Sequence, residues 1–258
     1  EPRSFNFHPK PHWEIGETLN IIDVDRAATM SGSHMYILRG LGARLQRSLI
    51  GYFLDAHEEN GYTEIYVPAM VRGDSMYASG QLPKFRDNLY HDAEADYWFI
   101  PTAEVPLTNI HRDEIVDEKS LPIRYTSHTP CFRREKFSAG REVRGIQRVH
   151  QFEKVEIYQL TTPENSPSAL SEMLEHCEIL LQELGLTYRV VQICSGDLGF
   201  NAAATYDLEV WAPGTNEWLE VSSISTCTDY QARRANIRYR RIKDRRTQFV
   251  HTLNGSGL

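Results

Sequence analysis

The sequence lacks any arrangement of cysteine or histidine that is typical of a structural metal or a disulfide framework. Its cysteines are far apart and form no C-x-x-C pair; they are Cys131, Cys177, Cys194 and Cys227. None of the ten histidines forms an H-x-x-x-H pair in a convincing helical pattern. Free thiols are typical of a reducing compartment, so we expect a cytoplasmic protein without a metal cage built from protein ligands alone.

Long apolar runs and glycine-rich phosphate loops are also missing. The apolar runs fall far short of the roughly 20 residues that a membrane-spanning helix needs, so no membrane association is expected. The chain does not open with a charged segment followed by an apolar one, which argues against a secretory signal. Neither G-x-x-x-x-G-K-[ST] nor a dinucleotide-binding turn occurs. A bound nucleotide would have to be held by side chains on a sheet.

What is present is typical of a globular protein. The 258 residues are 41% hydrophobic and 24% charged, which suits one large domain or two small ones with a sizeable core. The net charge of −7 argues against a protein that coats nucleic acid indiscriminately.

Positive charge is nevertheless concentrated in two stretches. Residues 131–158 hold seven cations, and residues 229–246 hold eight against two aspartates. The cations of the first stretch are Arg133, Arg134, Lys136, Arg141, Arg144, Arg148 and Lys154. A basic groove for a polyanion is one interpretation, and a solvated basic face is the other. For the second stretch alone the solvated face is favoured.

Hydrophobic periodicity predicts two substantial helices among many strands. Residues 42–60 place Leu45, Leu49 and Phe53 on one helical face, and Gly61 follows as a C-cap. A second helix is expected to follow Ser166, with Ser166 as N-cap and Pro167 in the first turn. Strands are expected over residues 62–71, 97–101, 122–133, 151–160, 187–194, 205–211, 217–223 and 247–253. Residues 1–20 show little periodicity and are predicted to be an irregular arm.

The order of these elements has no βαβ rhythm. We therefore predict an α+β fold, in which helices pack against an antiparallel β-sheet.

Alternation along residues 151–160 predicts a charged sheet face. Phe152, Lys154 and Glu156 should point to one side, while the intervening residues face the core. Arg133 and Glu135 would share a face of the preceding strand, so a hairpin could bring both charged faces into one cleft. Arginine grips phosphate or carboxylate bidentately, and an aromatic ring stacks on a base. The cleft suits a nucleotide plus a small zwitterion, although a surface ladder of salt bridges has the same pattern.

These residues also match a known family. The blocks FRRE (132–135) and RGIQRVHQFEKVEIY (144–158) resemble motif 2 of class II aminoacyl-tRNA synthetases, and the details resemble the bacterial-type seryl-tRNA synthetases. Further matching blocks are GLGARL (40–45), GYTEIYVPAMV (61–71), GQLPKF (80–85), PTAEVPLTN (101–109), GDLGFNAAATYDLEVW (196–211), QARRANIRYRR (231–241) and HTLNGSGL (251–258). TAEVPLTN and LNGSGL are specific to the seryl members.

The resemblance implies a ligase that forms seryl-adenylate from L-serine and ATP with Mg²⁺. The seryl group would then pass to the 3′ end of tRNA(Ser), and the selenocysteine tRNA stays open as a second acceptor. Residues 1–258 would form one catalytic domain, with motif 1 at 42–71, motif 2 at 131–158 and the start of motif 3 at 251–258. The family is homodimeric through motif 1, so a homodimer is expected. Lys136, Arg141 and Arg144 would lie where the acceptor end of tRNA arrives.

The resemblance also implies roles for individual residues. The catalytic residues would be Arg133, Glu135 and Arg148. The ATP-binding residues would be Arg133, Arg134, Glu135, Arg148, Val149, Phe152, Glu220, Val221, Ser222 and Ser223. The serine-binding residues would be Thr102, Ala103, Glu104, Arg133, Lys154, Glu156, Asn254 and Ser256.

Glu220 and Ser223 would hold the metal. They have opposite parity along a regular strand, so both can reach one ion only with a bulge or a twist. Arg134 faces away from Arg133 by the same rule.

Family members usually begin with a long helical arm and continue through a motif 3 helix, and neither is in this sequence. We therefore expect a catalytic core without the N-terminal arm and without the end of motif 3. Two alternatives stay open: a paralogue that aminoacylates a carrier protein, and a regulatory module without tRNA charging. The missing zinc constellation counts against the first, and the intact Arg133, Glu135 and Glu156 count against the second.

Overall fold

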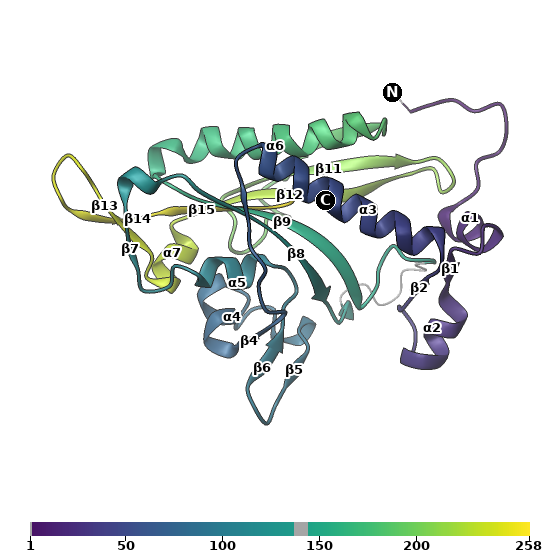
Figure 1. Cartoon of the computed structure of the whole chain (residues 1–258), viewed down its shortest axis with the longest axis horizontal. Helices are drawn as coiled ribbons and strands as arrows, with labels where there is room; N and C mark the ends of the chain where they lie inside the picture. Colours follow the sequence, from purple (N-terminus) through teal and green to yellow (C-terminus); the bar gives the residue numbers. More distant parts are fainter. Residues whose placement is uncertain (1, 137–143) are drawn as a thin grey trace.

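The computed structural model describes residues 2–136 and 144–258 (Figure 1). Arg141, one of the cations expected near the tRNA acceptor end, lies outside the described residues. The main element is a seven-stranded sheet in which only the β3–β8 pair is parallel. Its order is β10 (Tyr188–Gln192), β11 (Ala204–Ala212), β12 (Glu217–Thr228), β15 (His251–Ser256), β9 (Gln151–Thr161), β8 (Ile123–Phe132) and β3 (Thr63–Glu64). The α+β prediction is confirmed.

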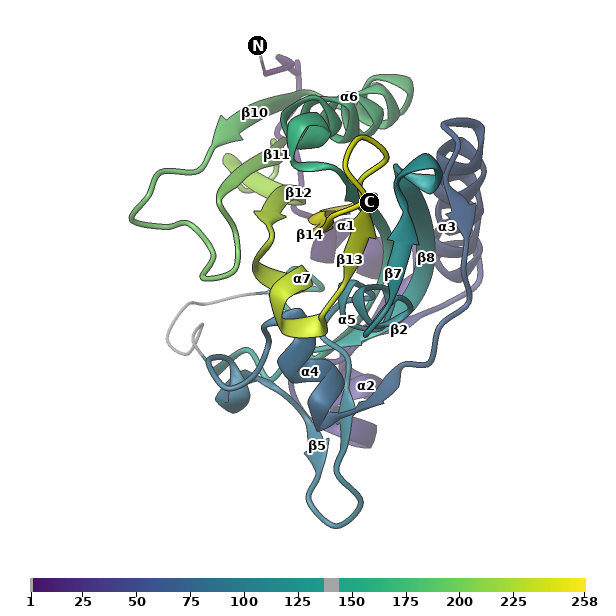
Figure 2. The ribbon, with the colours of Figure 1, turned by 90° about the vertical axis from the view of Figure 1, so that its left-hand side faces the viewer.

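Helices cover both faces of this sheet (Figures 1 and 2). The two long helices, α3 (Leu41–Glu59) and α6 (Ser166–Glu183), pack on one face. Three short helices lie on the other face; they are α4 (Gly73–Ser79), α5 (Glu104–Asn109) and α7 (Tyr230–Ala235).

The remaining elements form smaller sheets and turns at the periphery. They are α1 (His12–Thr18), α2 (Val24–Ser31), β1 (Ile22–Asp23), β2 (Ile37–Leu38), β4 (Met70–Arg72), β5 (His91–Asp92), β6 (Tyr97–Phe99), β7 (Ile115–Asp117), β13 (Arg238–Arg240), β14 (Thr247–Phe249), and the 3₁₀ turns η1 (Arg86–Asn88), η2 (Glu118–Ser120) and η4 (Pro163–Asn165). Across the described ranges, no helix combines the length and apolarity that a membrane crossing requires.

The alternation predicted for β9 is confirmed and explains how the sheet presents two chemistries. Val155 and Ile157 are buried against the α3 and α6 layer. Tyr158 is fully buried on the opposite side, in the cluster that includes α7. Lys154 and Glu156 share that second side, because side chains alternate along a strand. One strand therefore supplies both core packing and polar groups.

The last residues of the chain join α3 to the sheet. His57 of α3 is buried, and its Nε2 donates to the carbonyl oxygen of Gly257 at 2.9 Å. A Cβ atom at Gly257 would lie 2.5 Å from His57 Nε2, so this close approach requires glycine. Leu258 continues the pairing, because its carbonyl accepts from Val155 N–H at 2.9 Å. The segment after β15 is thus held between α3 and β9.

Several sequence expectations about helices were wrong in detail. The irregular arm at residues 1–20 contains α1, which follows Pro11. Ser166 is the first residue of α6 rather than its N-cap, because the turn η4 precedes it directly, and Asn165 occupies the cap position without a side-chain bond.

Some strand expectations were also wrong. Residues 62–71 hold only two short strands, with Pro68 between them in a segment that connects different sheets. Residues 247–253 are divided between β14 and β15, and β12 runs five residues further than the expected end at Ser223. The strand expected to include Arg133 ends at Phe132.

Candidate active site

A compact polar cluster lies at the side of β9 that faces the short helices. Lys154 Nζ is 2.7 Å from Glu156 Oε2 and donates to Thr102 Oγ1 at 2.8 Å. Thr102 Oγ1 in turn donates to Glu156 Oε2 at 2.7 Å. Glu156 is 1% exposed, so its charge is compensated by partners inside the protein. The structure brings these three predicted serine-binding residues into direct contact.

Glu104 places a second buried carboxylate beside this cluster. It begins α5 and is 3% exposed. Its Oε1 accepts from Gln231 Nε2 at 2.5 Å and from Asn201 Nδ2 at 3.3 Å. Burial, and then the charge of Glu156, raise the pKa of Glu104 to about 7, against the opposing effect of Lys154. An added cation between the carboxylates would relieve this repulsion, so the pair suits an ammonium group.

Asn254 and Ser256 complete this side of the cluster from β15. They lie opposite Tyr158 and Glu156 in the register with β9, on the same face of the sheet. Ala103 is also next to the cluster in sequence, but its side chain is fully buried in the core. Ala103 therefore supports the site from within the core.

The cationic part of the site lies where β8 ends. Arg133 N–H donates to the carbonyl of His150 at 2.9 Å, which continues the hairpin for one residue. The Arg133 guanidinium lies 5.1 Å from the centre of the Phe152 ring and donates to the carbonyl of Pro101 at 3.3 Å. A planar cation is therefore held beside the aromatic ring and the polar cluster.

The sequence predicted that strand alternation would place Glu135, but a turn places it instead. The strand has already ended before Glu135, whose φ angle is +49°. Glu135 Oε2 accepts from Arg148 Nη1 at 3.2 Å, and the Arg148 side chain is 48% exposed. Arg148 is thus paired with Glu135, and Arg133 is the cation that lies over Phe152.

Two further predicted ATP residues have less direct access. The Arg134 guanidinium lies 5.8 Å from the ring centre of Tyr90, whereas that of Arg133 lies beside Phe152. Val149 is 5% exposed, so its side chain belongs to the core beneath the site.

A bulge in β12 resolves the parity problem of the expected metal ligands. Leu208 lies opposite Ser222 while Glu209 lies opposite Glu220, so Val221 is the extra residue. Glu220 and Ser223 consequently share one face of the sheet, together with Asp207 and Glu209 of β11. Asp207 lies directly opposite Ser223.

Ser222 points to the other face of β12. Its hydroxyl donates to the carbonyl of Ser256 at 2.5 Å and its exposure is 1%. The side chain of Ser222 is therefore turned away from the face that carries Glu220 and Ser223.

Carboxylates lie close together at the bulge, and their charges affect one another. Burial, followed by the charge of Asp207, raises the pKa of Glu220, while Arg133 and Arg148 lower it. Asp207 Oδ1 is buried without a hydrogen-bond partner among the described residues. Among the described residues, no group of three or more His, Cys, Asp or Glu side chains is placed to hold a metal without other ligands. The few oxygen donors at this bulge fit Mg²⁺, which is usually bound by one or two carboxylates plus substrate phosphates.

Sequence reasoning missed several polar residues that organise the site. His34 Nδ1 bonds to the carbonyl of Arg148 at 3.0 Å, and its own carbonyl accepts from His150 N–H. The main-chain carbonyl of Asn88 accepts from Arg134 N–H at 3.0 Å, and its side-chain Oδ1 accepts from Lys136 N–H at 3.3 Å. Gln231 and Asn201 bind Glu104 from distant parts of the chain. No local pattern marks these contacts, because each joins residues far apart in sequence.

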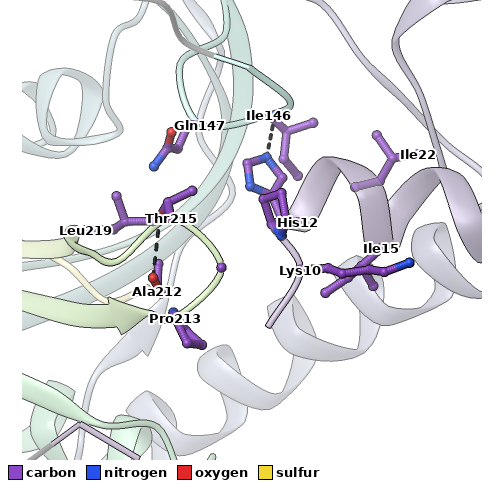
Figure 3. Close-up of a pocket in the computed structure, with 12 residues that line it drawn as sticks. Lys10, His12, Ile15, Ile22, Ile146, Gln147, Ala212, Pro213, Thr215 and Leu219 are labelled. Atoms are coloured by element: carbon purple, nitrogen blue, oxygen red, sulfur yellow. Dashed lines mark hydrogen bonds between the residues drawn. The ribbon is translucent and has the colours of Figure 1, made fainter. Parts of the chain in front are cut away.

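A separate cavity of about 420 Å³ lies beside this region (Figure 3). His12 Nε2 accepts from Ile146 N–H at 3.0 Å at its edge, and Gln147 and Leu219 also line it. None of the predicted site residues lines the cavity, although Gln147 and Leu219 directly precede Arg148 and Glu220. The polar cluster, and not this cavity, gathers the groups suited to a charged substrate.

Comparison with known proteins shows which family has a similar sequence and structure. The family model for the tRNA synthetase class II core domain (G, H, P, S and T) matches residues 84–258. A serine–tRNA ligase of Roseiflexus castenholzii is 58% identical over the whole chain, which spans 61% of that relative's length. A serine–tRNA ligase of Dehalococcoides mccartyi is 57% identical, with 63% of its length covered.

Solved structures agree with these sequence relatives. The crystal structure of seryl-tRNA synthetase from Pyrococcus horikoshii complexed with ATP matches with a TM-score of 0.95 and 43% identity, over 98% of this chain and 57% of that one. The prolyl-tRNA synthetase of Giardia lamblia, with a TM-score of 0.82 and 14% identity over 95% of this chain and 49% of that one, shares the fold alone. The resemblance seen in the sequence motifs is confirmed.

Proposed function

Because this chain belongs to the class II tRNA synthetase core family, we propose that it activates L-serine with ATP and transfers the seryl group to tRNA(Ser). The chain spans about three fifths of the length of its curated relatives. The observation that carries the proposal is the pair of buried carboxylates, Glu104 and Glu156, beside Lys154, Thr102 and the Arg133 guanidinium. This arrangement matches the ammonium, hydroxyl and carboxylate groups of serine.

Serine is proposed to lie between α5 and β9. Its ammonium faces the Glu104 carboxylate, and its hydroxyl donates to Glu156. Its carboxylate faces Arg133. Asn254 and Ser256 border the amino acid from β15. A site that must hydrogen-bond a hydroxyl rejects the analogue that lacks one by about 10⁴-fold. Alanine is therefore excluded because it leaves an acceptor position of Glu156 unfilled, and threonine is excluded by its size.

ATP is proposed to lie along the cationic part of the site. Arg133 contacts both the α-phosphate and the serine carboxylate, while Phe152 packs on adenine and Glu135 accepts from the adenine amino group. Arg148, with Arg134 and Val149 nearby, borders the nucleotide. A carboxylate oxygen of serine attacks the α-phosphorus and pyrophosphate leaves, which gives seryl-adenylate. The tRNA 3′-hydroxyl then attacks the seryl carbonyl and AMP leaves.

No side chain has to act as a nucleophile in this sequence of steps. Phosphoryl transfer relies on positioning and on neutralising charge, which is the chemistry that Arg133 and Arg148 offer. Glu220 and Ser223 would hold Mg²⁺, with the main chain of Val221 and Ser222 nearby. A bound Mg²⁺ neutralises phosphate charge.

The partners follow from the same proposal. The chain acts as one catalytic domain over residues 1–258 and is cytoplasmic, where tRNA is charged. Lys136 and Arg144 face the incoming tRNA(Ser), and the selenocysteine tRNA is a second candidate acceptor. Two copies pair through motif 1, whose exposed apolar residues include Leu45, Tyr66 and Met70.

Serine-dependent exchange of pyrophosphate into ATP tests the proposal directly. We expect exchange with serine and at most trace exchange with alanine or threonine. Arg133→Ala should reduce exchange by at least about 100-fold, because the reacting carboxylate and phosphate lose their shared cation. The control Arg112→Ala removes an arginine that pairs with Asp74 away from the site and should leave exchange unchanged.

The outcomes separate the alternatives. Exchange that survives Arg133→Ala would refute the assigned role of this arginine. ATP binding without serine-dependent exchange would favour a regulatory module. Transfer of an activated amino acid to a carrier protein instead of tRNA would identify a paralogue with a different acceptor.

A further inference from the structure

Gln231 of α7 lies at the centre of the polar contacts behind the serine-binding carboxylates. Its side chain is fully buried. Nε2 donates to Glu104 Oε1 at 2.5 Å and to the carbonyl of Ser79 at 3.0 Å. Oε1 accepts from Thr252 Oγ1 at 2.6 Å and from Tyr158 Oη at 3.4 Å. The amide thus joins α4, α5, β9 and β15 at one point.

The pattern of donors and acceptors fixes how this amide is oriented. A glutamine amide has two N–H donors and an oxygen with two acceptor sites, and all four are used here. The carbonyl of Ser79 can only accept, so the nitrogen must face it. An amide flip would place two donors against the hydroxyls and an acceptor against Glu104. The orientation that donates to Glu104 is therefore built into the fold.

We propose that Gln231 is a positioning residue that holds the Glu104 carboxylate in the direction and charge state needed to bind the ammonium group of the amino acid. This inference rests on the proposed function, because it assigns Glu104 to that ammonium. With Oε1 bound by the amides of Gln231 and Asn201, the second oxygen is presented in one fixed direction. Gln231 itself does not touch the substrate.

The groups around Glu104 explain why such support is needed. From β9, Glu156 repels a negative charge on Glu104 and Lys154 attracts it, while Tyr158 lies beside them. Cys227 of β12 is also buried nearby. Asn254 of β15 and Gln231 of α7 favour the charged form through hydrogen bonds.

Loss of the hydrogen bond from Gln231 should change the pKa of Glu104 in a defined direction. The pKa of Glu104 is already raised to about 7, and the bond from Gln231 opposes this rise. Without it the pKa rises further, so a larger share of Glu104 is neutral at pH 7 and cannot attract an ammonium. Serine binding should weaken, and it should weaken most on the acid side.

A purely structural role is the competing explanation, because Gln231 also binds Ser79 and Thr252. Gln159 provides a matched control for it. Gln159 is equally buried on β9, and its Nε2 donates to Tyr62 Oη at 2.8 Å on the face that carries α3 and α6. Replacing either glutamine with methionine removes a buried amide of similar size, but only Gln231→Met affects Glu104.

The experiment measures serine-dependent pyrophosphate exchange by the complete protein over pH 6–9, together with calorimetric binding of L-serine. For Gln231→Met we expect the KM for serine to rise by about 10- to 100-fold, as expected for losing a hydrogen bond to a charged group. The KM for ATP should stay unchanged, and the acid limb of the pH profile should move to higher pH. Gln159→Met should keep the wild-type KM for serine and the wild-type pH profile.

Gln231→Glu supplies a readout that packing alone would not move. In its protonated form, the introduced carboxylic acid can donate one bond to Glu104, so serine binding should be partly restored at low pH. As the pH rises, this proton is lost and two facing carboxylates repel each other. Activity should therefore fall toward high pH, which is opposite to the trend of Gln231→Met.

Thr252→Val is the milder variant to use if Gln231→Met does not fold. It removes the donor to Gln231 Oε1 but keeps the side-chain volume, and it should raise the KM for serine in the same direction by a smaller factor. Equal losses in Gln231→Met and Gln159→Met, or unshifted pH profiles, would overturn the positioning role. A wild-type protein that neither exchanges with serine nor binds it would instead refute the proposed function and, with it, this inference.

Discussion

At the scale of single residues, the site depends on placing two acids side by side inside the protein. Glu104 and Glu156 are 3% and 1% exposed, and Lys154 is the cation that directly contacts one of them. Sequence alternation predicted that Lys154 and Glu156 share a face, since parity is a local property of a strand. The contact of Gln231 with Glu104 was not predicted, because these residues are 127 positions apart and meet only after folding.

The buried Glu104 should make stability depend on pH. Its pKa is raised from 4.5 to about 7, so the folded protein binds this proton more tightly than the unfolded chain does. The stabilisation is therefore present below pH 4.5 and is lost as the pH rises toward 7. Glu104→Gln removes this loss, so the variant should gain roughly 1 to 3 kcal/mol over the wild type between pH 5 and pH 8.

Urea unfolding at several pH values measures this difference. Glu14→Gln, at an exposed acid of α1, serves as the control and should show no such trend. A difference between Glu104→Gln and wild type that stays constant with pH would contradict the raised pKa.

At the scale of elements, the bulge in β12 decides which residues face the proposed nucleotide site. Regular alternation places Glu220 and Ser223 on opposite faces, and the single extra residue Val221 brings them together. A bulge leaves little trace in a pattern of polar and apolar residues, so the sequence indicated only that one was needed. Long helices were easier to predict, because the apolar stripe of α3 recurs over several turns.

Replacing Glu220 with glutamine should weaken binding of MgATP, because the bulge places this carboxylate on the face that carries Ser223 and Asp207. The KM for MgATP should rise by at least about 10-fold, since a charged ligand is lost. Glu217→Gln changes an exposed acid of the same strand and should behave as the wild type. Exchange assays at varied MgATP make the comparison, with circular dichroism to verify folding. A wild-type KM for MgATP in Glu220→Gln would show that Glu220 does not serve the nucleotide.

At the scale of the whole molecule, apolar side chains remain exposed along motif 1. Leu45 is 57% exposed, Tyr66 96% and Met70 50%, so several large apolar side chains of one motif are open to a partner. The arrangement of layers was predicted from the order of elements. The partner of this surface could not be predicted from periodicity, because core-facing and partner-facing leucines have the same spacing.

Leu45→Glu should weaken pairing of two copies. A charge introduced into the proposed apolar contact costs desolvation on both subunits, so the dimer dissociation constant should rise by at least about 10-fold. Ile242→Glu changes an apolar residue outside motif 1 that is 54% exposed. This control should leave the molecular mass of the assembly unchanged. Light scattering over a dilution series distinguishes the two variants. A wild-type monomer at every concentration would refute the homodimer.

The bond between His57 and Gly257 has a consequence for how assembly and substrate binding influence each other. His57 belongs to α3, and Gly257 follows Ser256 directly at the end of β15. A helix shift at the contact between two copies would be transmitted to the strand that borders serine. Thermodynamic linkage is reciprocal: if dimerisation tightens serine binding by some factor, serine tightens the dimer by the same factor. Saturating serine would then lower the concentration at which two copies assemble.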